Sequence, residues 1–241
     1  MQMPEELLAR LINYLADTYK NQLILRGGML LRLLGSPRGT QDLDYSWIRT
    51  KKRNLFAQEL KTSLEQLQGI QVADVKSNSR GVFLQVLDRP SEQQAKVDIS
   101  VVASLNLPSE PMTTAALSNK FFMKPHIVST MNLSECFSNK IAAALERGLA
   151  RDFYDLVQLE PLASFDEATL KQRLSRLEIG RAKPIAVTLK EATAMLTTKM
   201  DTLNSKKLND ELASTIPPAQ LVGIETIIRA CVFRIIQKMR T

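Results

Sequence analysis

Histidine and cysteine are scarce in this chain, which narrows the chemistry available to it. Among 241 residues there are one histidine, His126, and two cysteines, Cys136 and Cys231. One histidine cannot anchor a histidine-rich metal site, and the absence of a G-x-S-x-G elbow argues against a Ser-His-Asp hydrolase. The cysteines lie far apart in apolar, helix-like surroundings, so we expect reduced, buried thiols rather than a disulfide or a zinc site. Any chemistry must therefore use carboxylates, lysines and arginines.

Long hydrophobic runs are also lacking. The closest approach, residues 221–236, is interrupted by Glu225, Arg229 and Arg234, whereas a membrane helix needs roughly 20 consecutive apolar residues. The first residues, MQMPEELLAR, carry acids where a signal peptide would have a basic start and an apolar run. With 44% hydrophobic and 24% charged residues, the composition is typical of a folded soluble protein. We expect a cytoplasmic protein without a membrane partner.

The balance of charge is basic. A formal net charge of +7 and a pI near 9.5 indicate a polyanionic partner, for which a nucleoside triphosphate and an RNA both qualify. Basic residues in the C-terminal part could follow an RNA backbone. Because aromatic residues are not interleaved with them, a solvated helical face is the favoured interpretation. These basic residues are Arg173, Arg176, Arg181, Lys183, Lys206 and Lys207.

Hydrophobic periodicity predicts a mixed α+β region followed by an all-helical one. Helices are expected at 7–21, 29–34, 54–67, 134–149 and from 152 to 159, and strands at 23–25, 42–47, 70–76, 82–87 and 96–102. Residues 105–125 carry Pro108, Pro111 and Pro125 and are expected to be a loop at a domain boundary. We therefore predict a mixed α+β domain over 1–125 and a helical domain over 126–241.

Three acidic residues give the clearest chemical signal. Asp42 and Asp44 lie at i and i+2 of a predicted strand and therefore share one face. Asp98, in a later alternating strand, is the natural third acid. Nucleotidyl transfer of the polymerase β type uses two divalent metals about 3.5 to 4 Å apart, held by such carboxylates. A lone D-x-D is usually a solvated strand or turn, so the order of elements carries this prediction.

A glycine pair precedes these acids. Gly27 and Gly28 stand between a predicted strand and a predicted helix, where missing side chains let phosphate oxygens approach backbone N–H groups. By itself a Gly-Gly pair usually marks only a turn. The succession of strand, Gly-Gly, helix, D-x-D strand and a later strand with one acid is specific, and it predicts a mixed sheet of the polymerase β type.

The stretch LRGGMLLRLLGSPRGTQDLDYSW resembles the first motif of the AbiEii/AbiGii-type nucleotidyltransferases, the toxins of type IV toxin–antitoxin systems. KVDIS is similar to the strand that carries the third acid, and NKIAAALERGLARDFYDL to the helical signature of that family. The resemblance covers roughly residues 20–160. Met29 stands where the family usually has threonine or serine, and no motif is assigned beyond about Leu162.

The resemblance implies roles for further residues. Lys140 would offset charge on the triphosphate; the alternative is a surface lysine. Asp152 would orient Lys140 or Arg151, or act as a base on the acceptor; the alternatives are charge complementarity at a helix N-terminus and a structural ion pair with an arginine. Arg26 and Arg38 flank the phosphate region and could hold triphosphate oxygens, although ordinary surface arginines fit nearly as well. Signature positions also match Arg147, Arg151, Tyr154 and Asp155, and Tyr154 is expected to pack rather than react.

These observations predict a magnesium- or manganese-dependent nucleotidyltransferase. Its nucleotidyltransferase domain would span 1–125, and the helical domain over 126–241 would complete the active-site cleft. It would move a nucleoside monophosphate from a nucleoside triphosphate to an acceptor. By resemblance the acceptor is an RNA, at a tRNA 3′ end, and the protein is a toxin restrained by an antitoxin. Alternatives are transfer to a protein or small-molecule hydroxyl, and an idle nucleotide-binding module. A repressor is disfavoured because no helix-turn-helix with a basic recognition helix is evident.

Overall fold

The computed structural model describes residues 4–180 and 183–240, so Arg181 lies outside the described residues. The chain forms two compact units, Met1–Met131 and Asn132–Thr241. The division falls a few residues after the position expected from the sequence, because a strand at Ile127–Thr130 belongs to the sheet of the first unit. Each unit has its own hydrophobic core.

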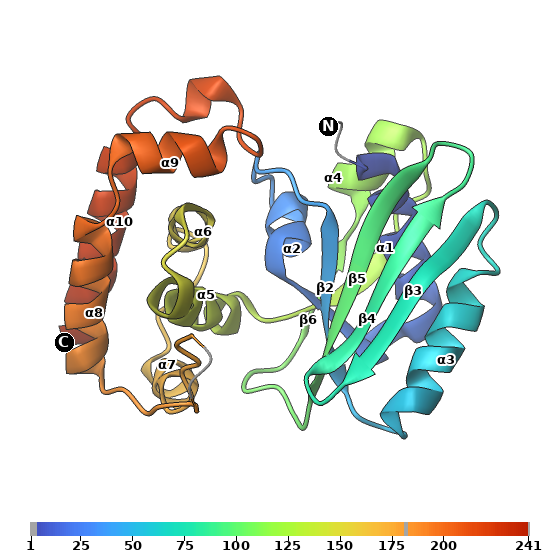
Figure 1. Cartoon of the computed structure of the whole chain (residues 1–241), viewed down its shortest axis with the longest axis horizontal. Coiled ribbons are helices and arrows are strands. Elements are labelled where there is room, and N and C mark those ends of the chain that lie inside the picture. Colours follow the sequence, from blue (N-terminus) through green and yellow to red (C-terminus); the bar gives the residue numbers. More distant parts are fainter. Residues whose placement is uncertain (1–3, 181–182, 241) are drawn as a thin grey trace. The chain divides into compact units, whose positions relative to one another are not determined.

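In its described residues the first unit contains a seven-stranded mixed sheet with the order β3-β4-β5-β2-β1-β7-β6 (Figure 1). β2 runs parallel to β5, and β1 runs parallel to β7, whereas the remaining neighbours are antiparallel. The strands are β1 Leu23–Arg26, β2 Asp42–Ile48, β3 Ile70–Asn78, β4 Gly81–Asp88, β5 Gln93–Val102, β6 Glu110–Thr113 and β7 Ile127–Thr130.

The hydrophobic core of the sheet unit lies on one face of the sheet. Helices α1 (Glu5–Tyr19) and α3 (Arg53–Leu64) cover this face (Figure 1). Trp47 of β2 stacks on Phe56 of α3 with ring centroids 4.0 Å apart, and Tyr19 of α1 meets Phe56 edge-on at 5.8 Å. Since strand side chains alternate between faces, the buried Leu43, Tyr45 and Trp47 send the intervening residues of β2 to the other face.

The proline-containing segment is more ordered than the sequence predicts. A loop at a domain boundary is the sequence expectation for residues 105–125, but they contain β6, the short helix α4 (Ala115–Ser118) and a 3₁₀ turn (Asn119–Phe121). Pro111 lies within β6. A proline is tolerated there because β6 is the last strand of the sheet, where one side of the strand needs no ladder bonds.

The second unit is helical in its described residues, apart from one isolated bridge between Leu177 and Ile185. Several helices begin at capping side chains: Asn132 accepts from the Ser134 N–H, and Thr188 forms a capping box with Glu191. The helices are α5 Leu133–Arg147, α6 Ala150–Leu159, α7 Glu167–Leu174, α8 Leu189–Asp201, α9 Ser205–Leu212 and α10 Ile224–Arg240.

Two further expectations concern burial. Cys136 and Cys231 are both buried, as predicted. Burial raises the pKa of Cys231 to about 12, so this thiol is protonated at neutral pH. Within residues 4–180 and 183–240, no helix is long and apolar enough to cross a membrane.

The aromatic cluster predicts a large effect of one core substitution. Phe56→Ala removes the ring that stacks on Trp47, leaves a cavity, and should lower the free energy of unfolding by about 3–5 kcal/mol. Leu55→Ala is the matched control, because Leu55 is the preceding residue of α3 and is 61% exposed. Urea denaturation followed by tryptophan fluorescence measures both. Equal losses in the two variants would contradict the assignment of this core.

Candidate active site

The three acids predicted from the sequence meet on the face of the sheet opposite the core. In the parallel pairing of β2 with β5, Asp44 is the register partner of Asp98, and Asp42 is the register partner of Lys96. All three carboxylates are half-buried, and Lys96 is exposed. The alternation that buries Leu43 and Val97 on the core side thus delivers the acids to one location.

Electrostatic strain accompanies this arrangement. The pKa of Asp98 is raised above its ordinary value, first by burial and then by the negative charges of Asp44 and Asp42. Lys96 and Arg26 act in the opposite direction, but they do not cancel the effect. The acids therefore form a site of concentrated negative charge that a cation would stabilise.

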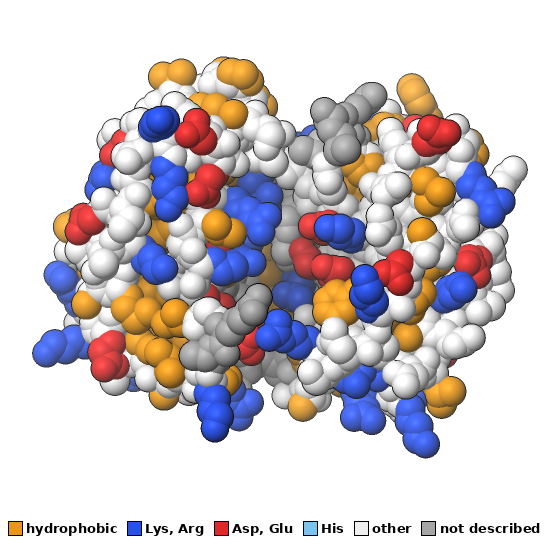
Figure 2. Space-filling view, viewed as in Figure 1, with side chains coloured by type: hydrophobic (Ala, Val, Ile, Leu, Met, Phe, Trp, Pro, Cys, Tyr) orange, Lys and Arg blue, Asp and Glu red, His pale blue; other side chains and the backbone are white. Residues whose placement is uncertain are grey.

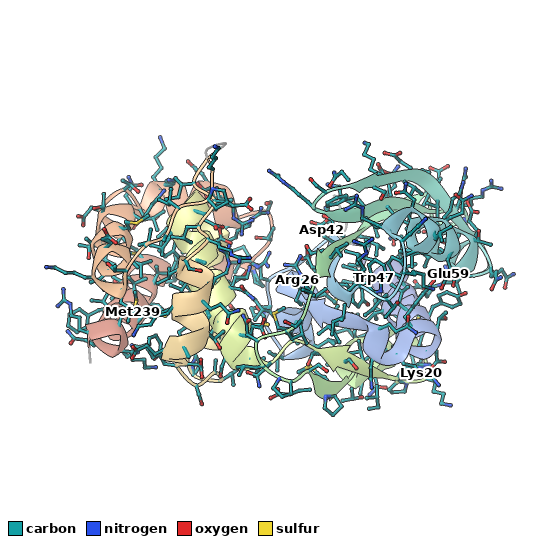
Figure 3. The ribbon with its side chains drawn as sticks, turned by 90° about the horizontal axis from the view of Figure 1, so that it is seen from below. Lys20, Arg26, Asp42, Trp47, Glu59 and Met239 are labelled. Carbon is teal, nitrogen blue, oxygen red and sulfur yellow. The ribbon has the colours of Figure 1, made fainter. Side chains whose placement is uncertain are left out.

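Arg26 ends β1 beside this cluster. It is the register partner of Asp44, and its Nη2 donates a hydrogen bond of 2.7 Å to Ser100 Oγ on β5. Its Nε is buried and has no hydrogen-bond partner among the described residues. Figure 3 places Arg26 and Asp42 on the side of the sheet unit away from Glu59 of α3, with Trp47 between them. Arg26 therefore lies beside Asp44, and its contact with triphosphate oxygens stays a prediction.

The glycine pair makes room for the side chains of the protein itself. Gly27 begins α2 (Gly27–Leu33) with φ +72°, and a Cβ at this position would lie 2.2 Å from Asp44 Oδ2. A Cβ on Gly28 would lie 2.8 Å from Arg38 Nη2 and 3.1 Å from Thr40 Oγ1. Because both residues lack a side chain, the backbone can pack in direct contact with the Asp44 carboxylate and the Arg38 guanidinium. The sequence analysis explains the two glycines only by the approach of phosphate oxygens to the backbone, and does not predict these contacts within the protein.

Arg38 is enclosed by the same turn. Its side chain is buried, with 9% of the residue exposed, and its Nη1 donates to the Gly39 carbonyl at 3.4 Å. Together, Arg38 and Arg26 bring two guanidinium groups to the border of the acidic cluster. Such groups bind phosphate oxygens through paired N–H donors.

A second cluster of charges lies within the helical unit. Lys140 Nζ on α5 is 2.5 Å from Asp155 Oδ2 and 3.8 Å from Asp152 Oδ1, both on α6. Arg147 also binds Asp152, with Nη2 2.6 Å from Oδ1 and Nε 3.2 Å from Oδ2. The two carboxylates are fully buried and the Lys140 side chain is 18% exposed. Asp152 therefore forms both the pair with Lys140 and the arginine ion pair that the sequence leaves as alternatives.

Sequence reasoning assigns no role to two members of this cluster. Arg147 and Asp155 match the helical signature, yet only their neighbours receive functions from it. The spacing does contain a signal, because residues 152 and 155 are i and i+3 on α6 and share a face of that helix. Tyr154 is buried and its hydroxyl donates to Gln220 Oε1 at 2.9 Å, as expected for a packing residue.

Whether the acids suit a metal depends on their donor chemistry. Among residues 4–180 and 183–240, no group of three or more His, Cys, Asp or Glu side chains is already gathered to hold a metal ion. Asp42, Asp44 and Asp98 nevertheless supply hard carboxylate oxygens on one face, and burial together with the charges of Asp44 and Asp42 raises the pKa of Asp98. Hard divalent cations such as magnesium prefer these ligands, so the donor set fits.

Neutralising Asp98 should stabilise the protein. In metal-free buffer at pH 7, Asp98→Asn should raise Tm by about 2–4 °C because it removes a half-buried charge that Asp44 and Asp42 also repel. The pKa of Asp98 in the folded protein lies above its ordinary value of 3.8. Wild-type stability therefore falls as the pH rises from 3.8 to the folded-state pKa. The advantage of the variant is therefore complete above the folded-state pKa and is lost below pH 3.8.

A control for this measurement is Asp74→Asn. The Asp74 carboxylate lies 2.8 Å from Lys76 Nζ, which lowers its pKa. Neutralising it should leave Tm unchanged or slightly lower. Thermal denaturation in the presence of EDTA measures both variants, and a lower Tm for Asp98→Asn would count against the repulsion described above.

The turn at Gly27 predicts a second, sterically caused effect. Gly27→Ala adds backbone strain at positive φ and a clash with the Asp44 carboxylate. Gly35→Ala is the matched control, because Gly35 has φ +94° and a Cβ placed there would have no atom of the described residues within 4 Å. Chemical denaturation should show a loss of about 1–3 kcal/mol at Gly35 and a larger loss at Gly27. Equal losses would mean that Asp44 moves aside freely.

Solved structures share this fold at low sequence identity. MenT4, a nucleotidyltransferase toxin from Mycobacterium tuberculosis, has a TM-score of 0.53 and 16% identity, with 94% of this chain and 91% of that chain covered. JHP933 from Helicobacter pylori has a TM-score of 0.55 and 17% identity, with 98% of this chain and 91% of that chain covered. No curated protein matches the sequence.

The family assignment rests on the sequence of nearly the whole chain. Residues 10–227 match the family described as nucleotidyl transferase AbiEii toxin, type IV toxin–antitoxin system. That span includes the glycine turn, the three acids of the sheet and the charge cluster of the helical unit. The chain therefore belongs to the AbiEii family of nucleotidyltransferase toxins.

Proposed function

We propose that this toxin transfers a nucleoside monophosphate from a nucleoside triphosphate to an RNA, at the 3′ end of a tRNA. The observation that carries the proposal is the register of Asp44 with Asp98, beside Asp42 and against the glycine turn. Family membership supports the transfer chemistry. The net charge of +7 supports a polyanionic acceptor.

The acids are the proposed holders of divalent metal. Asp42, Asp44 and Asp98 would bind magnesium or manganese through carboxylate oxygens. Bound there, the cations would neutralise charge on the triphosphate and lower the pKa of the attacking hydroxyl. Relief of the repulsion around Asp98 would contribute to the affinity for the cations.

The remaining groups of the sheet unit would bind and orient the triphosphate. Arg38 and Arg26 would donate to its oxygens, and the first N–H groups of α2, at Gly27 and Gly28, would face the phosphates because they have no partners within the helix. Negative charge increases on the departing pyrophosphate during transfer. Guanidinium groups already held in place stabilise that charge without reorganisation.

The transfer itself is a displacement at the α-phosphorus. A bond forms between the acceptor oxygen and the α-phosphorus, while the bond from that phosphorus to the oxygen bridging the α- and β-phosphates breaks. The electron pair of the broken bond leaves with pyrophosphate. The proton of the acceptor hydroxyl is released to a water molecule of the solvent as the new bond forms.

Lys140 is proposed to contribute positive charge toward the nucleotide. Asp152 and Asp155 are positioning residues in this proposal, because the two buried carboxylates fix the ammonium group from α6. Arg147 supplies a compensating charge to Asp152. Without such compensation, two buried carboxylates beside one lysine would be costly to fold.

The biological role follows from the family. A type IV toxin implies a cognate antitoxin, and we propose that transfer to tRNA arrests growth until the antitoxin opposes it. Transfer to a protein or small-molecule hydroxyl is the rival outcome, and the same labelling experiment distinguishes it.

The proposal is tested by incubating the full chain with each α-³²P-labelled nucleoside triphosphate, magnesium and total cellular RNA. We expect label in small RNA with the wild type. Asp44→Ala should lose at least about a hundredfold in rate, because it removes one of the acids that hold the cations. Denaturing gels of RNA and of protein, run in parallel, measure the label in each.

A matched control keeps the result specific. Glu59→Ala removes an exposed acid from α3, on the other side of the sheet unit (Figure 3), and should transfer at the wild-type rate. Label in protein alone would retain the chemistry and overturn the RNA acceptor. Equal activity of Asp44→Ala and wild type would overturn the assigned site.

A further inference from the structure

An apolar and amide-rich surface adjoins the acids on the same face of the sheet. In β4, Val82, Leu84 and Val86 are buried on the core side, so Phe83 and Gln85 point to the opposite face. Phe83 is the register partner of Asp98, and Gln85 is the register partner of Lys96. Phe83 is half-buried and Gln85 is exposed. The aromatic ring of Phe83 thus lies on the strand next to Asp98, on the face of the sheet that carries the acids.

A pocket of about 350 Å³ lies beside this surface. Its lining includes Asp42, Gln41, Gln85, Gln94 and Lys96. Gln85 Nε2 donates to Gln94 Oε1 at 2.6 Å, which orients both amides. The volume falls within the usual range for small-ligand sites, and amide groups supply both the donors and the acceptors that base edges require. Figure 2 shows acidic, basic and apolar side chains side by side on this face of the sheet unit.

The order of the strands places the two reactants of the proposed transfer on opposite sides of the acids. The sheet runs β4-β5-β2-β1, and the glycine turn with Arg38 follows β1. A triphosphate held at the glycine turn therefore leaves its pyrophosphate on the β1 side. Because attacking and leaving oxygens are roughly in line in phosphoryl transfer, the acceptor approaches from the side of β5 and β4.

We propose that the β5–β4 face binds the terminal nucleotide of a single-stranded RNA 3′ end. Phe83 stacks on the base, the paired amides of Gln85 and Gln94 contact its edge, and Lys96 binds the adjoining phosphate. This inference rests on the proposed nucleotidyl transfer and assigns its acceptor subsite.

Charge and chemistry favour RNA at this face. Two exposed lysines lie near Phe83: Lys76, its register partner on β3, and Lys96 on β5, the register partner of Gln85. Lys76 also pairs with Asp74, so Lys96 is the cation assigned to a phosphate. An aromatic ring close to a cation suits a flexible nucleic-acid strand, since the ring stacks on any base and the cation binds a phosphate. Glutamine amides add hydrogen bonds to the base edge without adding charge.

Direct binding tests the subsite independently of catalysis. The probe is a fluorescein-labelled RNA hairpin with a four-nucleotide single-stranded 3′ overhang, compared with the same hairpin ending flush. Fluorescence anisotropy with the full wild-type chain, without nucleoside triphosphate, should show tighter binding of the overhang. Phe83→Ala should weaken that binding about tenfold or more through lost stacking. Phe83→Tyr, which keeps a stacking ring, should restore it.

Matched controls separate the subsite from general aromatic or amide effects. Phe122 is 99% exposed and lies outside the sheet, and Gln58 is exposed on α3. Phe122→Ala and Gln58→Ala should bind the overhang like the wild type, whereas Gln85→Ala should bind it more weakly. Circular dichroism spectra and Tm of each variant establish that it is folded.

Steady-state kinetics provide the second readout. If labelled RNA is formed, Phe83→Ala should raise KM for the RNA and leave KM for the nucleoside triphosphate unchanged. A rise only in KM for the nucleoside triphosphate would assign the face to the donor nucleotide and overturn the inference. Equal binding of overhang and flush hairpins by the wild type would also overturn it. Nucleotidyl transfer to another acceptor could still be observed in that case, so the two proposals fail separately.

Discussion

The parallel pairing of β2 with β5 is the constraint on which the site depends. It places Asp44 opposite Asp98 and keeps both carboxylates half-buried. Hydrophobic packing on the other face of the sheet enforces this arrangement. A shift of either strand by one residue would turn its acid toward Trp47 and Phe56. The hydrophobic core therefore fixes the register, and the register in turn forces like charges together. The pKa of Asp98 is raised because this register keeps its carboxyl group half-buried and beside the charges of Asp44 and Asp42.

Most elements of the sheet unit could be predicted because their side-chain pattern is local. The period of two in β2 and β5 and the helical spacing of α1 are visible without any neighbour. The segment around Pro111 could not be predicted in this way. Proline is ordinarily a loop signal, and it becomes compatible with a strand only at the edge of a sheet. Which strand lies at an edge depends on pairings between distant residues, and these leave no local pattern.

The predicted site residues also differ in whether a local pattern or contacts between distant residues explain them. Asp42 and Asp44 could be grouped from alternation alone, because sharing a face is a property of one strand, whereas adding Asp98 required the order of the elements along the chain. The reason for Gly27 required coordinates, since nothing in a Gly-Gly pair indicates that the Asp44 carboxylate occupies the missing side chain's space. Likewise, the fixing of Lys140 by Asp155 depends on the angle between α5 and α6. The chain turns between these two helices at Gly148, where φ is +62°.

Both edges of the sheet are unsuited to accepting another strand. At one edge, β6 contains Pro111, which lacks an N–H group. At the other, β3 is distorted by a bulge between Val72 and Asp74 and carries the exposed Lys76. Such features interrupt the row of backbone donors and acceptors that an incoming strand would pair with. A protein that recognises the sheet unit must therefore do so through side chains, where its specificity is encoded residue by residue, and not through backbone pairing that almost any extended chain can supply.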